Sequence, residues 1–179
     1  MKKWMKCFTM FGGLMLGLLM ILPAGQAADM TTAKAAEYVL ATVKAARTVF
    51  VKGVLADAKK GGVTPNEDWV KDDHGIMLPA QFVKEIGKEL RDFELGLLGT
   101  EPLYKSNAAK SPKEKEMLAE LAGGKKKFIS GEDGGKTIAM SADFAIVQGC
   151  ADCHNNHAKT TKKDWKKGDF MGAIVVRMK

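Results

Sequence analysis

The sequence predicts an α+β domain in which helices come first and an antiparallel sheet comes last. As far as about residue 122, apolar residues recur at three- and four-residue spacing, which is typical of amphipathic helices. After Gly124 the pattern changes to short apolar and β-branched segments separated by glycine turns, which is typical of strands. Helices that precede the strands, rather than alternate with them, indicate the α+β class.

The N-terminal segment, residues 1–27, has the features of a cleavable secretory signal peptide. It opens with lysines, continues through an apolar stretch at 8–22 and ends in small residues. The alternative is an uncleaved anchor, but the apolar stretch is only at the lower limit of a spanning helix, and the small residues favour cleavage after Ala27 or Ala28. We therefore expect a periplasmic protein, with residues 28–179 forming one domain.

Cleavage changes both the cysteine count and the charge. Cys7 leaves with the signal peptide, so the exported chain keeps only Cys150 and Cys153. Loss of the three signal-peptide lysines reduces the net charge from +7 to +4. A mildly basic exported domain without a basic and aromatic recognition motif does not indicate a nucleic-acid-binding protein.

A long first helix is predicted from Thr31 or Thr32, either of which can cap it, to about Lys60, where Gly61 and Gly62 end it. Apolar residues at helical spacing form one face: Ala36, Val39, Leu40, Val43, Ala46, Phe50 and Val54. A helix of this kind either packs over a sheet, which we favour, or pairs with the same helix of a second subunit in a homodimer.

Further helices follow. Pro65 is expected to open a short helix through Val70 that Trp69 anchors to the core, and Pro79 to open a second main helix through about Phe93. Residues 94–104 can be extended. The last helix is expected from Ser111 to Ala122, with Met117, Leu118 and Leu121 on its buried face. Strands are expected at 126–130, 136–142, 145–149 and 172–178, with a turn at 133–135.

Cys150-Ala151-Asp152-Cys153-His154 has the CxxCH pattern of covalent c-type haem attachment. In this chemistry both thiols add to the haem vinyl groups as thioethers. The next side chain is then held beneath the iron, so His154 is the predicted proximal axial ligand.

Three other interpretations of the cysteine pair are weaker. A zinc site needs a second pair of ligands, and the remaining histidines are only His74 and His157. A thioredoxin-like redox pair belongs early in a βαβ unit, whereas this motif lies near the C-terminus. A plain structural disulfide leaves the adjacent histidine unexplained.

A ligand on the other side of the iron should come from a distant segment. His74 and Met77 are the candidates, with His74 favoured because the chain is poor in histidine; water is the alternative. Met117 and Met140 have the spacing of ordinary core residues. His157 is too close to His154, because three extended residues span at most about 10 Å.

Several segments make this chain similar to a known family. They are residues 74–82, residues 101–121, and the CxxCH motif followed by Trp165-x-x-Gly168-Asp169-x-x-Gly172-Ala173. In these the chain resembles the Tll0287-like haem domain family, also known as DUF3365, over nearly the whole mature length. The resemblance implies a PAS-like fold with a long N-terminal helix, flanking helices and one haem c. Members occur as sensory modules of chemoreceptors and cyclases and as free-standing proteins. Since the chain stops at Lys179 without a second membrane segment or signalling domain, we expect a free-standing protein.

Two functions remain open at this level. The first is a haem-based module that senses redox state or binds a small gas or redox ligand and reports to a separate partner. The second is a small electron carrier that docks to acidic redox partners through Lys162, Lys163, Lys166 and Lys167, although these lysines also suit a solvated loop. An enzyme such as a peroxidase is not indicated, because no catalytic constellation is visible.

Overall fold

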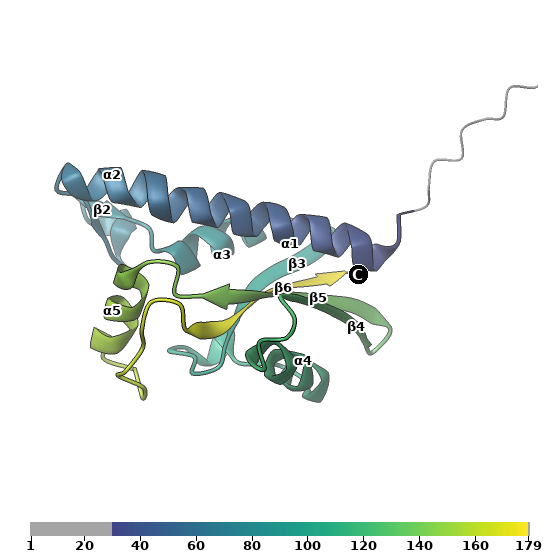
Figure 1. Ribbon diagram of the computed structural model, residues 1–179. Coiled ribbons are helices and arrows are strands. Elements are labelled where there is room, and N and C mark those ends of the chain that lie inside the picture. The colour runs from purple at the N-terminus through teal and green to yellow at the C-terminus, as the bar shows by residue number, and fades with distance from the viewer. Residues whose placement is uncertain (1–29, 179) are drawn as a thin grey trace, which may run out of the picture.

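The computed structural model describes residues 30–178, so the predicted signal peptide lies outside the described residues. The described chain forms a four-stranded antiparallel sheet with helices against both faces (Figure 1). This arrangement confirms the α+β class. Within residues 30–178, no helix has the length and apolar character needed to cross a membrane.

The sheet has the strand order β3-β6-β5-β4, and each neighbouring pair is antiparallel. Its strands are β3 (Phe93–Gly99), β4 (Phe128–Asp133), β5 (Lys136–Phe144) and β6 (Phe170–Met178). Gly134 and Gly135 form the β4–β5 turn with φ values of 57° and 77°, a left-handed conformation that glycine adopts without a steric penalty. The predicted turn and three of the predicted strands are therefore present.

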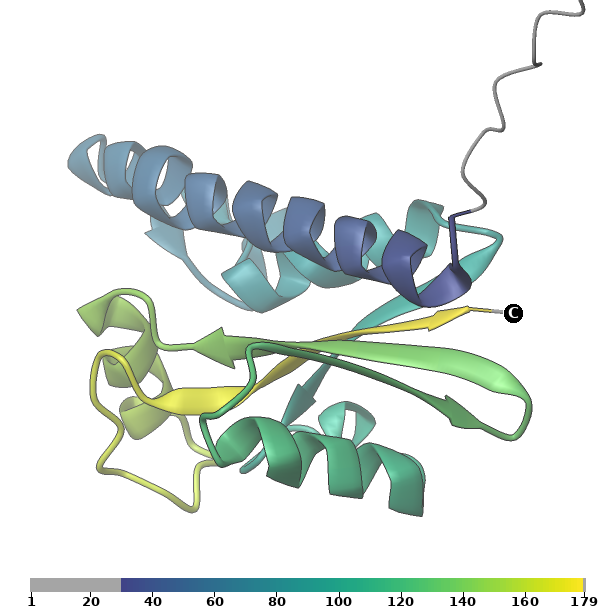
Figure 2. The ribbon, with the colours of Figure 1, turned by 45° about the vertical axis from the view of Figure 1, so that its right-hand side comes forward.

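Helices cover the two faces of this sheet unequally. The long helix α1 (Thr32–Val49) lies across one face with α3 (Pro79–Glu89) beside it, and α4 (Pro112–Ala122) lies on the other face (Figures 1 and 2). Successive residues of β6 point to opposite faces. Ile174 therefore packs with the α1 side, whereas Val175 packs with the α4 side. Both faces of β6 are thus buried, which accounts for its continuous apolar run from Ala173 to Val176.

The first helix begins and ends where the sequence predicts. Thr31 caps it, since its Oγ1 accepts a hydrogen bond from the Lys34 amide at 3.2 Å. The helical segment continues through η1 (Phe50–Val54) and α2 (Leu55–Lys60) and stops at Gly61, with Gly62 at φ 82°. The cap and the stop are local signals, and both act as expected.

The segment η1 is a π-helix, and it changes which residues face the interior. A π turn contains about one residue more than an α turn, so the buried face moves on by one position. Val51 and Leu55 are each 6% exposed, whereas Val54, predicted to be buried, is 49% exposed. The prediction for Val54 was wrong because a uniform period of 3.6 residues does not include this inserted residue.

This shift can be tested by comparing two alanine substitutions. Val51→Ala removes buried methyl groups and should lower the free energy of unfolding by about 2 kcal/mol. Val54→Ala removes exposed methyl groups and should change it by less than about 0.5 kcal/mol. Urea denaturation of both variants measures the difference, and equal losses would contradict the π-helical register.

Two predicted helices differ from the structure. Instead of a helix at 65–70, a two-residue strand β1 (Thr64–Pro65) pairs with β2 (Gly75–Ile76), and only a 3-10 turn η2 (Trp69–Lys71) lies between them. The Thr64 amide donates to the His74 carbonyl at 2.8 Å, so the backbone here makes hydrogen bonds between the two strands rather than within a helix. Trp69 is only half-buried and is not part of the core clusters.

The second main helix, α3, ends at Glu89 rather than near Phe93. Leu90 is already extended, with φ −89° and ψ 137°. Phe93 pairs with Met178 in the sheet, so a long-range contact overrides the helical spacing of this segment. The helix α4 matches its prediction, with Ser111 accepting a hydrogen bond from the Glu114 amide and with Met117, Leu118 and Leu121 buried. A 3-10 turn, η3 (Lys105–Asn107), precedes it.

Candidate functional site

The CxxCH motif lies on the helix α5 (Gln148–Asn156), in the connection between β5 and β6. The strand predicted at 145–149 is absent, and that prediction was wrong. Ala145 forms backbone hydrogen bonds with the turn at Gly168 and Asp169, at 2.8 and 2.9 Å, rather than with a strand. Val147 is extended only as the residue that precedes the helix.

Helical geometry brings the three residues of the motif together. Residues three and four positions apart lie on the same face of an α-helix, so Cys150, Cys153 and His154 share one face of α5. All three line a single cavity of about 1110 Å³. Both cysteines are free thiols. Burial raises the pKa of the Cys153 thiol, and the charge of Glu67 acts in the same direction.

The cavity lies between α5, the second half of the long helix, the start of α3 and the neighbouring ends of β3 and β6. Small-molecule pockets commonly measure about 300–1,000 Å³, so this cavity has room for a large planar ligand. Much of its wall is apolar. The apolar lining residues include Val51, Leu55, Leu78, Leu97, Leu98, Ile146, Val147 and Met171. The π-helical segment thus supplies part of the wall, and π turns are frequent at functional sites.

Trp165 positions the imidazole of His154. The two rings meet edge to face with 6.2 Å between centroids, and Trp165 is only 6% exposed. Asn155 fixes the tryptophan backbone, because its amide group donates to the Trp165 carbonyl at 3.0 Å and accepts from the Trp165 amide at 2.9 Å. Asn155, the residue after His154, therefore ties α5 to the loop that carries Trp165.

The protonation state of the His154 imidazole suits a metal ligand. Burial lowers the pKa of its imidazole, which favours the neutral form that binds metals. Its Nδ1 is buried and has no hydrogen-bond partner among the described residues, which is costly unless another group satisfies it. Two free thiols and a neutral imidazole on one face of a helix, beside a large cavity, fit a covalently attached haem.

A buried ion pair forms another part of the cavity wall. Arg47 Nη1 lies 2.6 Å from Asp143 Oδ1, and both residues are buried and line the cavity. Burial raises the pKa of Asp143, while the charges of Arg47 and Lys44 oppose that effect. Burial lowers the pKa of Lys44, whose ammonium donates to the Ala142 carbonyl at 2.7 Å. Sequence analysis missed this pair because its members lie on α1 and β5, far apart in the chain.

Glu67, Tyr104 and His157 form a polar cluster at the rim of the cavity. The Tyr104 hydroxyl donates to Glu67 Oε2 at 2.6 Å, and this bond raises the pKa of Tyr104. His157 Nε2 lies 3.4 Å from Glu67 Oε1, and its ring contacts Tyr104 edge to face. The segment after α5 is thereby joined to two distant loops.

The structure places His74 and Met77 outside the cavity. His74 is exposed, and its backbone amide donates to Asp72. Met77 packs against the cluster formed by Phe50, Val51 and Leu55. Neither side chain is brought together with His154, whereas Met171 at the start of β6 is the methionine among the lining residues.

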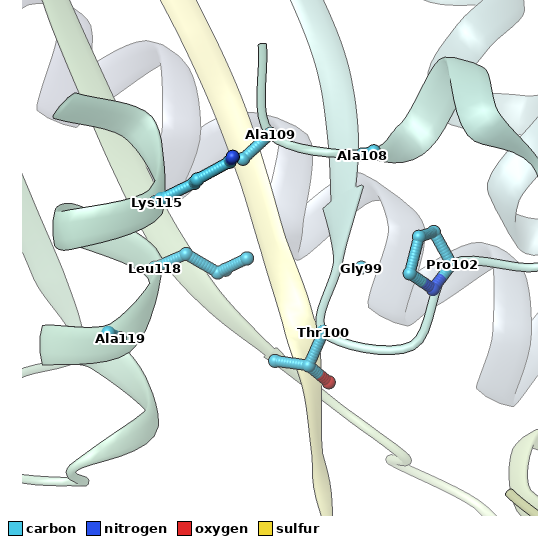
Figure 3. Close-up of a pocket in the computed structure, with 8 residues that line it drawn as sticks. All are labelled: Gly99, Thr100, Pro102, Ala108, Ala109, Lys115, Leu118 and Ala119. Carbon is cyan, nitrogen blue, oxygen red and sulfur yellow. The ribbon is translucent and has the colours of Figure 1, made fainter. Parts of the chain in front are cut away.

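A second cavity of about 330 Å³ lies between the end of β3 and α4 (Figure 3). In Figure 3, Leu118 and Lys115 approach it from α4, and Gly99 and Pro102 border it on the opposite side. Gly99 and Pro102 also line the larger cavity. The lining of this smaller cavity contains no cysteine or histidine.

The described residues do not provide the ligands of a zinc site. Within residues 30–178, no three histidine, cysteine, aspartate or glutamate side chains are grouped closely enough to hold a metal ion. The cysteine pair therefore lacks the additional protein ligands that a structural zinc site requires.

Comparison with known proteins gives one family and one solved structure. The family model Tll0287-like, described as Tll0287, matches residues 25–179. The structure titled as that of the cyanobacterial heme-protein Tll0287 is 13% identical, with a TM-score of 0.45, and the match covers 56% of this chain and 68% of that chain. Among curated proteins no sequence matches significantly.

Proposed function

The chain belongs to the Tll0287-like family, and from this premise we propose that it is an exported c-type cytochrome with one covalent haem. A solved protein that the family is named after is described as a heme-protein. The observation that carries the proposal is the position of Cys150, Cys153 and His154, which share one face of α5 and line the large cavity.

Each residue has a distinct part in holding the group. The thiols of Cys150 and Cys153 would form the two thioether bonds to the haem, and the imidazole of His154 would bind its iron. Trp165 and Asn155 orient that imidazole before the haem is attached. When bound, the haem supplies an iron centre that exchanges one electron or takes up a small ligand.

Attachment is tested by mass spectrometry of the chain expressed with a cytochrome c maturation system. We expect the mass of a chain that begins after Ala27 or Ala28 and carries one haem. Cys150→Ala and Cys153→Ala should each reduce the thioether count by one, which a pyridine haemochrome spectrum reports. A wild-type chain of unmodified mass would refute the proposal, and a retained N-terminus would refute export by cleavage.

For the role of the haem, we favour a sensing or ligand-binding module that reports to a separate partner. Two observations support this role. His74 and Met77 lie outside the large cavity, and most of the cavity's surface is apolar. Met171, water or an external ligand would then be the candidates for the second iron ligand.

Electron transfer to an acidic partner is the second candidate, and a specific observation supports it. Lys163, Lys166 and Lys167 are exposed on the loop that follows α5, and Lys167 also lines the cavity. A cationic edge beside a redox group steers association with an acidic partner.

Carbon monoxide distinguishes the two roles. In the ligand-binding role, the reduced haem protein should bind CO, and His74→Ala and Met77→Ala should leave its spin state unchanged. Spectral titration of the three proteins measures both properties. Exclusion of CO, with a low-spin spectrum that His74→Ala converts to high spin, would instead show a closed iron ligated by that loop.

A further inference from the structure

The helix α1 and its continuation have an outward face against which no other helix or strand of the described structure packs. It lies opposite the buried face and is formed by Tyr38, Ala41, Ala45, Val49 and Gly53 at three- and four-residue spacing. Tyr38 and Val49 are 55% and 67% exposed. In Figure 1 no other helix or strand lies above the long helix.

Two residues of opposite charge, Lys34 and Asp57, lie at the two ends of this outward face. Lys34 lies one turn before Tyr38, and Asp57 lies one turn after Gly53. In the single chain they pair with Glu37 and Lys60, but these ion pairs are exposed, and such pairs contribute little to stability. A second copy in antiparallel orientation would bring Lys34 of each chain against Asp57 of the other. A parallel orientation would instead bring like charges together.

The same antiparallel register places large side chains opposite small ones. With Ala45 at the centre, Ala41 of one copy lies opposite Val49 of the other. Tyr38 lies opposite Gly53, because the π turn adds one residue on the Gly53 side of the centre. Gly53 has no explanation within one chain, because a Cβ added there would meet nothing within 4 Å. A glycine inside a helix costs about 1 kcal/mol relative to alanine. The open space over Gly53 has room for the tyrosine ring of a second copy.

We propose that this face pairs with the same face of a second copy to form an antiparallel homodimer. Such contacts are self-complementary about a two-fold axis, here at Ala45. The seam from Lys34 to Asp57 would be about 36 Å long. Since the buried face of α1 points away from the seam, the two domains lie on opposite sides of it. The pairing does not depend on the haem.

The first test places a charge at the centre of the seam. Ala45→Arg should raise the dimer dissociation constant at least about tenfold, because two like charges would meet at the axis. Ala119→Arg, on the exposed face of α4, is the matched control and should leave it unchanged. Sedimentation velocity over a range of concentrations of the full mature chain measures the dimer, and circular dichroism confirms that each variant is folded.

The second test fixes the orientation. Lys34→Glu and Asp57→Lys should each weaken the dimer severalfold, and the two changes in one chain should restore it, since both contacts become Glu–Lys pairs again. A wild-type chain that stays monomeric at about 100 μM, or an Ala45→Arg dimer of undiminished affinity, would overturn the proposal. A double variant without recovery would overturn the antiparallel register.

Discussion

Asp143→Leu is expected to lower the free energy of unfolding by about 3–5 kcal/mol, because it leaves the Arg47 guanidinium buried without its counter-charge. The two side chains are 2.6 Å apart at the cavity wall, and Arg47 Nε already has no partner among the described residues. Urea denaturation measures the loss. The matched control is Glu85→Leu, which breaks the exposed pair with Lys88 and should cost less than about 1 kcal/mol.

The double variant distinguishes the interaction between the two charges from the contribution of their surroundings. Arg47→Met together with Asp143→Leu removes both charges and should recover most of the stability lost by either single change, since well-packed apolar residues commonly replace a buried ion pair without loss. Losses that simply add would show that the two charges do not interact in the folded protein.

The same variants affect the haem through its surroundings. Removal of the Asp143 carboxylate leaves net positive charge beside the cavity and should raise the reduction potential of the loaded protein, whereas Arg47→Met should lower it. Potentiometric titration measures both shifts. An ion pair with only a structural role would not produce shifts of opposite sign.

Gly172→Ala is the second substitution with a large expected effect, about 4 kcal/mol of stability. Gly172 lies near the start of β6 with φ 153°, and a Cβ there would overlap the Leu98 carbonyl oxygen of β3. Backbone atoms have no alternative rotamer, so β3 and β6 would have to separate. Thermal or urea denaturation measures the loss.

Gly124→Ala provides the control for backbone conformation. Gly124 also has a positive φ, 76°, but its surroundings are open. Alanine there should therefore cost only about 1 kcal/mol, the strain of the left-handed conformation. If both variants lost the same stability, the close approach of β3 to Gly172 would not explain the result.

Local signals in the sequence predicted the elements that depend on neighbouring residues. Thr31 and Ser111 cap their helices as expected, and Gly134 and Gly135 form the turn. In contrast, Phe93 has helical spacing but pairs with Met178, a contact that spans most of the domain. The residue pattern of a short segment carries no information about a contact with a distant residue.

The candidate site also contains some features that follow from local sequence and others that depend on distant contacts. The prediction of Cys150, Cys153 and His154 rests on their spacing along the chain, because that spacing is itself the requirement for covalent haem attachment. The Arg47–Asp143 pair and the contact of Trp165 with His154 arise from packing between separate elements. His74 was favoured because the chain is poor in histidine and because its loop lies beside residues that carry the family resemblance. Neither feature reports its position in the fold, which leaves His74 outside the cavity.

The location of α5 has a consequence for how the protein folds. The strands β5 and β6 pair from Ile138–Arg177 to Phe144–Phe170. Residues 145–169, which include Cys150, Cys153 and His154, form the loop that joins them. The entropic cost of closing a loop rises by only about 0.6 kcal/mol for each doubling of its length. The sheet can therefore assemble before the haem arrives, and hydrogen exchange should show protected amides in β5 and β6 of the haem-free chain.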